Sequence, residues 1–179
     1  LFPRDLAKTH ADPRYRITAE GNWTAPMLTK SSQEEKPRYG ITGFAARTDS
    51  TARLGLNIDP KKKGHWHFNK IRVLGYASSS KAYPVVRTSS GQTVRHLYDT
   101  LTASYLFNLP KVTDSVVVDF VVPEGESFVF TGFQPITGNK GVNFYASGVN
   151  GARVTAWSEQ CADLERDLQL VKPDLAVFG

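Results

Sequence analysis

From about residue 15 to residue 147, short segments rich in Val, Phe, Tyr and Thr are separated by clusters of Gly, Pro, Ser and Asn. Apolar and polar residues alternate in several of these segments, which is typical of strands with one buried face. The expected strands cover residues 14–18, 41–46, 53–58, 70–76, 82–87, 93–98, 115–121, 127–133 and 141–145. About eight short strands with turn signals between them predict a mainly β fold, an antiparallel β-sandwich or jelly roll.

The pattern changes after residue 147, where apolar residues take helical spacing. They recur every four or three positions, at Trp157, Cys161, Leu164, Leu168 and Val171. This spacing predicts one amphipathic helix of about four turns. Thr155 is the expected N-cap, and Lys172-Pro173 ends the helix. Residues 174–178 then form an apolar run typical of a strand buried on both faces, as in a parallel sheet.

These patterns divide the chain into three parts. Residues 1–20, interrupted by Pro3 and Pro13, are expected to be a tether. Residues 21–147 form the β-sandwich, and residues 148–179 form a short helix-plus-strand stub of an α/β domain. One helix and one strand cannot build a core by themselves. We therefore expect the chain to be a piece of a longer protein.

Composition and charge exclude several classes of protein. The 179 residues carry 22 Lys and Arg against 17 Asp and Glu, a modest net charge of +5. The basic run Lys61-Lys62-Lys63 follows a turn signal and is either a solvated loop or a patch for an anionic polymer such as cell-wall glycan; no nucleic-acid motif accompanies it. Cys161 is the single cysteine, so no internal disulfide is possible. No apolar run reaches the ~18 residues that would span a membrane.

Two histidines, His65 and His67, flank Trp66 and would share one face of a strand. Both imidazoles could then bind one metal ion, with His96 or Asp59 as a third ligand, as in a stand-alone metal-dependent or sugar-binding lectin. The simpler interpretation is a polar rim of the sandwich with Trp66 turned inward. A third is a ligand groove in which Trp66 stacks on the ligand. We expect neither a metal site nor a cofactor.

Aromatic residues are candidates for carbohydrate binding, because the C–H faces of a sugar are apolar and its hydroxyls need polar partners. The candidates are Trp23, Trp66, Tyr76, Tyr83 and Tyr98. Trp23 and Trp66 lie beside turn residues, which favours exposure. An aromatic residue of a sandwich more often belongs to the core, so this interpretation competes with a purely structural one.

A loop rich in Gly and Asn, residues 145–154, leads directly into the expected helix. Free backbone N–H groups at such a position can stabilise an anion or an oxyanion. The order of this loop, a helix, a buried strand and Gly179 resembles the SGNH (GDSL-type) esterase family. The resemblance implies that Gly151 supplies an oxyanion-hole N–H, with Gly148 as the other candidate. It also places Gly179 at or just before the Gly-x-Asn-Asp block, whose Asn is absent.

The N-terminal segments 1–9, 13–17 and 21–23 resemble the region after the nucleophile block in one branch of that family. Members of this branch are similar to bacterial peptidoglycan O-acetylesterases. In them a β-sandwich like a carbohydrate-binding module is inserted between the nucleophile block and the oxyanion glycine. The resemblance implies that residues 1–20 tether the sandwich to the catalytic domain, and that the protein is periplasmic or secreted.

The catalytic motifs of the family are missing from this chain. It contains neither the Gly-Asp-Ser nucleophile block nor the Asp-x-x-His pair. Without a nucleophile and its base no acyl-enzyme can form, so we expect no esterase activity from this chain alone. The resemblance implies a non-catalytic accessory sandwich that positions a glycan, possibly peptidoglycan, for its parent esterase. The alternative is a structural or protein-interaction sandwich that binds no sugar. The expected partners are a glycan polymer and the remaining catalytic domain.

Overall fold

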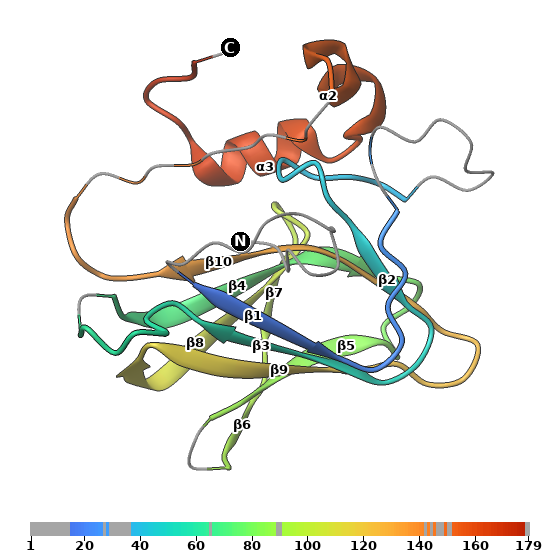
Figure 1. Ribbon diagram of the computed structural model, residues 1–179. Coiled ribbons are helices and arrows are strands. Elements are labelled where there is room, and N and C mark those ends of the chain that lie inside the picture. The colour runs from blue at the N-terminus through green and yellow to red at the C-terminus, as the bar shows by residue number, and fades with distance from the viewer. Residues whose placement is uncertain are drawn as a thin grey trace.

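Two antiparallel sheets face each other in the computed structural model, which describes residues 15–26, 28, 37–64, 66–88, 91–141, 143, 145, 149 and 152–177 (Figure 1). The first sheet has the order β1 (Arg16–Glu20), β3 (Ala52–Asn57), β9 (Ser115–Val121), β5 (Tyr83–Arg87) and β6 (Thr93–Val94). The second has the order β2 (Ala46–Thr48), β10 (Phe128–Ile136), β4 (Phe68–Ala77), β8 (Ser104–Thr113) and β7 (Leu97–Asp99). The predicted β-sandwich is confirmed.

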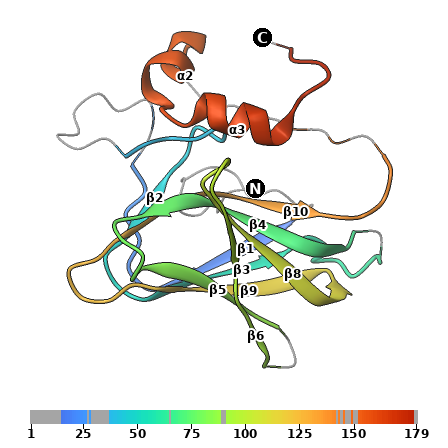
Figure 2. The ribbon, with the colours of Figure 1, turned by 180° about the vertical axis from the view of Figure 1, so that it is seen from behind.

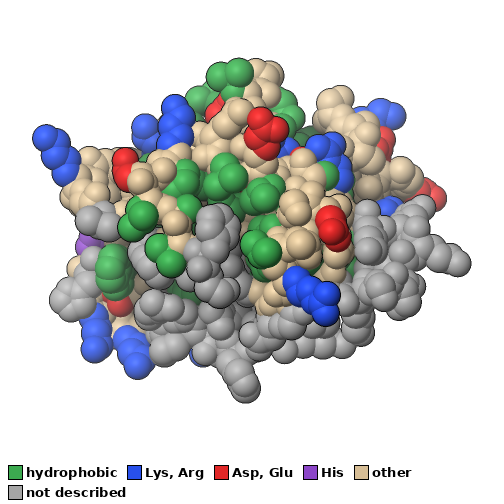
Figure 3. Space-filling model, turned by 90° about the horizontal axis from the view of Figure 1, so that it is seen from above, with side chains coloured by type: hydrophobic (Ala, Val, Ile, Leu, Met, Phe, Trp, Pro, Cys, Tyr) green, Lys and Arg blue, Asp and Glu red, His purple; other side chains and the backbone are tan. Residues whose placement is uncertain are grey.

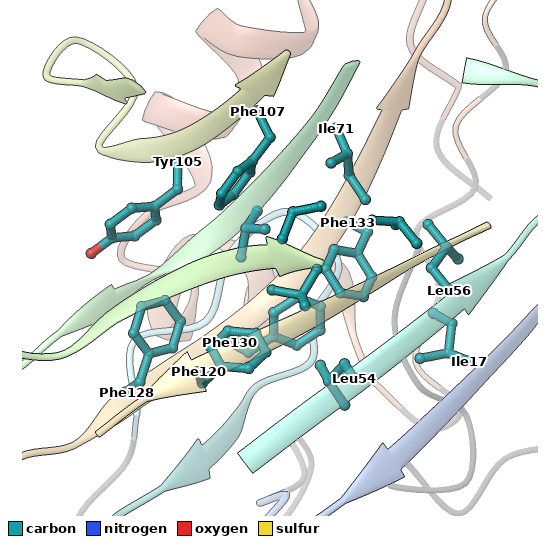
Figure 4. Close-up of a cluster of buried hydrophobic side chains, with 14 of the residues drawn as sticks. Ile17, Leu54, Leu56, Ile71, Tyr105, Phe107, Phe120, Phe128, Phe130 and Phe133 are labelled. Carbon is teal, nitrogen blue, oxygen red and sulfur yellow. The ribbon is translucent and has the colours of Figure 1, made fainter. Parts of the chain in front are cut away.

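The core between the sheets is aromatic. Alternation along each strand turns every second side chain inward, as in β3, where Leu54 and Leu56 are buried. The ring of Phe120 from β9 packs against Phe128 and Phe130 from β10, with centroids 4.9 and 5.9 Å apart (Figure 4). Burying a side chain of this size contributes about 1.5–3 kcal/mol, so this cluster is the main link between the two sheets.

Most strands lie where the hydrophobic pattern predicts them, and the differences have local causes. The expected strand 41–46 is mostly a turn, and only its last residue begins β2. The expected strand 93–98 is divided into β6 and β7, because the chain passes there from one sheet to the other. In the candidate 141–145, the described residues 141, 143 and 145 are not in a strand. The sequence interpretation missed β8.

Two short helices, α2 (Val154–Gln160) and α3 (Leu164–Val171), cover the outer face of the second sheet (Figure 1). They rest on a second apolar cluster that joins helical residues to the sheet and to the 39–45 segment. Its buried members are Leu28, Tyr39, Ala45, Val129, Val149, Ala156 and Cys161. Trp157, Cys161 and Leu164 of the predicted apolar stripe belong to this cluster. Leu168 is exposed instead, and the buried residue of α3 is Asp167, so the second half of the predicted apolar face is wrong. The C-terminal segment packs on the sandwich rather than standing apart from it.

The single predicted helix is divided in two, and the break has a polar cause. The Asp163 N–H donates to the Tyr39 carbonyl at 3.3 Å instead of continuing the helix. The Asp163 carboxylate, which is buried, pairs with Arg38 at 2.5 Å and with Arg166 at 3.2 Å. The first helix begins after Arg153, so Thr155 lies inside α2 and is not its N-cap.

The end of α3 follows the prediction, but the strand after it does not form. Lys172 takes the left-handed conformation of a C-cap, and Pro173 follows. Residues 174–177 are exposed and in no strand, because no described strand lies beside them to pair with; residue 178 lies outside the described part. No helix in the described ranges is long and apolar enough to cross a membrane.

Candidate functional site

The open side of the sandwich is crossed by the segment between β6 and β7. Because β6 is an edge strand of the first sheet and β7 an edge strand of the second, Arg95 and His96 bridge the two layers (Figure 2). His96 is wedged edge-on against Tyr105, with ring centroids 4.9 Å apart, and its Nδ1 lies 3.1 Å from the Pro84 carbonyl oxygen. His96 thus packs against Tyr105 and Phe107 at this edge of the core.

A hollow of about 800 Å³ lies beside this crossing, and we call it the tyrosine hollow. Its lining residues are Tyr76, Ala77, Ser79, Ser80, Ala82, Tyr83, Val85, Arg95, His96, Tyr98 and Tyr105. They come from the end of β4, the turn after it, β5, the crossing segment, β7 and the start of β8. The lining thus combines aromatic rings, hydroxyl groups and one guanidinium group, with no acidic side chain among its described members.

The aromatic rings of the hollow form a continuous row. Tyr83 contacts His96, with centroids 6.2 Å apart, and Tyr105 lies beside Tyr98 at 5.1 Å. The outer rings of the row are exposed, Tyr83 by 36% and Tyr98 by 52%. Tyr105 is buried at the base, and this burial raises its pKa to about 12. Two accessible rings over a fixed base can accept a flat apolar ligand face.

A charged turn fixes the position of Tyr98. The neighbouring Asp99 accepts hydrogen bonds from the backbone N–H groups of Leu101 and Thr102, at 3.1 and 3.3 Å. Arg72 on β4 donates to Asp99 at 2.8 Å and also to the hydroxyls of Thr102 and Ser104. The hydrogen bond with Thr102, followed by that with Arg72, lowers the pKa of Asp99 to about 2. The strand that carries Tyr98 is therefore anchored across the sheet.

The structure brings three of the residues considered for sugar binding to this hollow, Tyr76, Tyr83 and Tyr98. Tyr76 contributes less, because its ring packs beneath the helices. Its hydroxyl accepts the Arg38 N–H at 2.8 Å, and the Arg38 guanidinium lies 5.9 Å from its ring centroid. Burial raises the pKa of Tyr76.

The two tryptophan candidates lie elsewhere. Trp23 packs edge-on against Phe120 at 5.3 Å, and its indole N–H donates to the Glu20 carbonyl at 3.1 Å, so it extends the core. Trp66 is 64% exposed and is not among the residues that line the tyrosine hollow. Gly151 and Gly148, the candidates for the oxyanion N–H, lie outside the described residues.

The residues considered as metal ligands have other surroundings. Asp59 accepts the backbone N–H groups of Lys63 at 3.0 Å and Gly64 at 2.5 Å and so shapes the loop that carries the lysine run. His96 is held among aromatic rings, and His65 lies outside the described residues. In the part of the chain that the structure describes, no three His, Cys, Asp or Glu side chains gather as a metal site.

Sequence reasoning missed Arg95 and Tyr105 as members of the site and considered His96 only as a metal ligand. Tyr105 lies on the unrecognised strand β8, where alternation of Tyr105, Phe107 and Leu109 was the available signal. Arg95 and His96 carry no such signal, because only the passage between sheets brings them to the hollow.

No protein-family model and no curated protein matches the chain. Among solved structures, the fold is similar to one described as a peptidoglycan O-acetylesterase in action, with a TM-score of 0.52 and 20% sequence identity. The match covers 93% of this chain and 42% of that chain, so this chain spans about two-fifths of that esterase's length. The likeness shows a common fold over a segment of the longer protein.

Proposed function

We propose that this chain is the non-catalytic accessory β-sandwich of an SGNH-type carbohydrate O-acetylesterase, and that it positions a glycan for ester hydrolysis. The observation that carries the proposal is the match of nearly the whole chain to less than half of a peptidoglycan O-acetylesterase. Peptidoglycan is accordingly the first glycan to test. A protein that binds peptidoglycan would be periplasmic or secreted, and we propose that location for this protein. The absence of Gly-Asp-Ser and Asp-x-x-His blocks from the sequence supports a non-catalytic role for this part.

The tyrosine hollow supplies the chemistry that glycan binding needs. The exposed ring of Tyr98 can stack on the apolar C–H face of a sugar, and Tyr83 offers a second ring on the other side of His96. The hydroxyl of Ser80 lies on the same lining and can exchange hydrogen bonds with sugar hydroxyls. Binding would hold one stretch of polymer while an attached catalytic domain acts on another.

The parent enzyme would follow the serine esterase scheme. A serine outside this chain would attack the acetyl ester, and the Gly151 N–H would donate to the oxyanion of the tetrahedral intermediate. The helical layer supports this division of labour, because the helices that follow Gly151 in the sequence are packed and hydrogen-bonded to the sandwich and the 38–41 segment.

The experiment is co-sedimentation of the 179-residue chain with insoluble peptidoglycan, alongside p-nitrophenyl acetate hydrolysis. We expect binding without hydrolysis. Tyr98→Ala should reduce the bound fraction at least threefold, since stacking on one ring contributes about 1 kcal/mol. Trp66→Ala is the matched control, because it removes an exposed aromatic ring outside the hollow. Unchanged binding by Tyr98→Ala, or hydrolysis by the chain alone, would contradict the proposal.

A structural sandwich that braces its partner domain is the second candidate, and one observation favours it. Hydrophobic side chains gather on the upper, helical face of the molecule (Figure 3). The exposed fractions there are 66% for Val154, 79% for Leu175 and 84% for Val177. Such residues are typical of a protein contact. If bracing is the sole role, the chain will fail to bind peptidoglycan, and Leu175→Ser will lower the thermal stability of the full-length esterase.

A further inference from the structure

A second hollow, of about 540 Å³, adjoins the tyrosine hollow, and Arg95 lines both. Its other lining residues are Gln92, Thr93, Val94, Asn108 and Pro110, and we call it the amide hollow. Gln92 comes from the turn before β6, and Asn108 from β8. Side-chain amides are planar groups that donate and accept hydrogen bonds, as sugar hydroxyls and acetamido groups require.

The guanidinium group of Arg95 is not neutralised by its surroundings. Arg95 is exposed, and none of the ion pairs within the described part of the chain includes it. No acidic side chain is found among the described residues that line either hollow. Arg53 and Arg87 of the sandwich differ from Arg95, since both pair with Asp119.

We propose that the two hollows form one extended cleft, which takes an oligosaccharide bearing a free carboxylate, with that carboxylate paired to Arg95. The inference rests on the proposed glycan-binding function of the tyrosine hollow and names its ligand class. A guanidinium group matches a carboxylate with two parallel N–H donors, which a neutral sugar cannot exploit. One sugar would lie on the tyrosine rings and the next against Gln92 and Asn108.

The test is calorimetric titration of the 179-residue chain at about 50 mM salt, where screening is moderate. Three tetrasaccharides share one β-1,4-linked N-acetylglucosamine backbone. The first is neutral chitotetraose, the second carries a lactyl carboxylate on alternate sugars and no peptide, and the third is the methyl ester of the second. We expect the carboxylate form to bind about fivefold more tightly than its ester, as an exposed ion pair allows.

Variants assign this preference to Arg95. Arg95→Gln should abolish the difference between acid and ester. Arg16→Gln should keep it, because Arg16 is also an exposed arginine but lies on β1, at the opposite edge of the sheet from β6. Asn108→Ala should weaken binding of the tetrasaccharide but not of a disaccharide, if the cleft extends into the amide hollow.

The outcomes separate this inference from the proposed function. Equal affinity for all three tetrasaccharides, lost in Tyr98→Ala, would keep glycan binding and overturn the role of Arg95. A preference for the acid that persists in Arg95→Gln would also overturn it. A tetrasaccharide affinity unchanged by Asn108→Ala would overturn the extended cleft. Failure of every tetrasaccharide to bind would overturn the glycan-binding function itself.

Discussion

Replacing Asp167 tests how α3 is fastened to the sandwich. The carboxylate is buried, accepts the Ile41 N–H at 2.8 Å and pairs with Arg166 at 3.1 Å. Alanine would leave the Ile41 donor without an acceptor, which costs about 1–3 kcal/mol. Arg166 would keep its second partner, Asp163, at 3.2 Å. We therefore expect Asp167→Ala to weaken the docking of α3 by about 2 kcal/mol.

Asparagine at the same position should behave differently. Burial raises the pKa of Asp167 despite its bonds to Ile41 and Arg166, so folding disfavours the charged form. Asn keeps an oxygen acceptor and removes the charge, and we expect Asp167→Asn to change docking by less than about 1 kcal/mol at pH 7. A raised folded-state pKa adds a stabilisation beyond the hydrogen bond to Ile41, and this added part is fully present below the unfolded pKa of about 3.9. It is lost as the pH rises through the folded-state pKa.

Hydrogen exchange of the α3 amides measures this docking, with intrinsic rates corrected for pH. Glu165→Gln is the matched control, because Glu165 is an exposed carboxylate on the same helix. The expected order of protection at pH 7 is wild type close to Asp167→Asn, both well above Asp167→Ala. If Asn opens the helix as much as Ala does, or if protection in the wild type increases with pH, the carboxylate does not act as described.

Three further predictions concern the hairpin, the sheet and the thiol. Asp99→Asn should lower the melting temperature at pH 7, followed by circular dichroism. In the wild type, the contribution of Asp99 to stability should disappear as the pH falls from about 4 to about 2. Identical melting of the two proteins at pH 7 would contradict the role of the turn. Gly75 has φ +148°, and a Cβ added there would collide with a backbone carbonyl of β10. Gly75→Ala should therefore lower the free energy of unfolding, measured by urea denaturation, by about 3 kcal/mol. The control Gly141→Ala should leave it unchanged, because a Cβ there meets open space. Burial raises the pKa of the Cys161 thiol to about 11, so this thiol should resist a disulfide reagent at pH 8. It should react faster in Asp167→Ala, where the helices are less firmly docked. Rapid labelling of the wild type would show that the helices are not docked.

Strand positions were predictable wherever one face is buried and the pattern has period two, as in β3 and β9. The pattern failed where tertiary contacts outweigh it. Residues 41–44 are apolar enough for a strand, yet they turn because the Ile41 N–H is bound by Asp167 from α3. The helical stripe was right only in its first half, since Trp157, Cys161 and Leu164 pack on the sandwich whereas Leu168 is exposed. Contacts of Asp163 with Tyr39 and Arg38 divide the predicted helix into two.

The candidate site was less predictable than the fold. Tyr83 was predicted because aromatic rings can stack on sugars. The same argument selected Trp23, which instead packs against the core. Arg95 and His96 reach the hollow only because the chain changes sheets between β6 and β7. That crossing follows from the packing of the whole sandwich, and a local pattern of residues does not contain it.

The most direct test of the central claim is an NMR map of the amides of this chain that shift when soluble peptidoglycan fragments are added. Binding at the tyrosine hollow predicts shifts within residues 76–85 and 92–105, with little change at Trp66 or in α3. Shifts confined to Trp66 or to the helical layer, or no shift at millimolar fragment, would contradict the proposed glycan-positioning role.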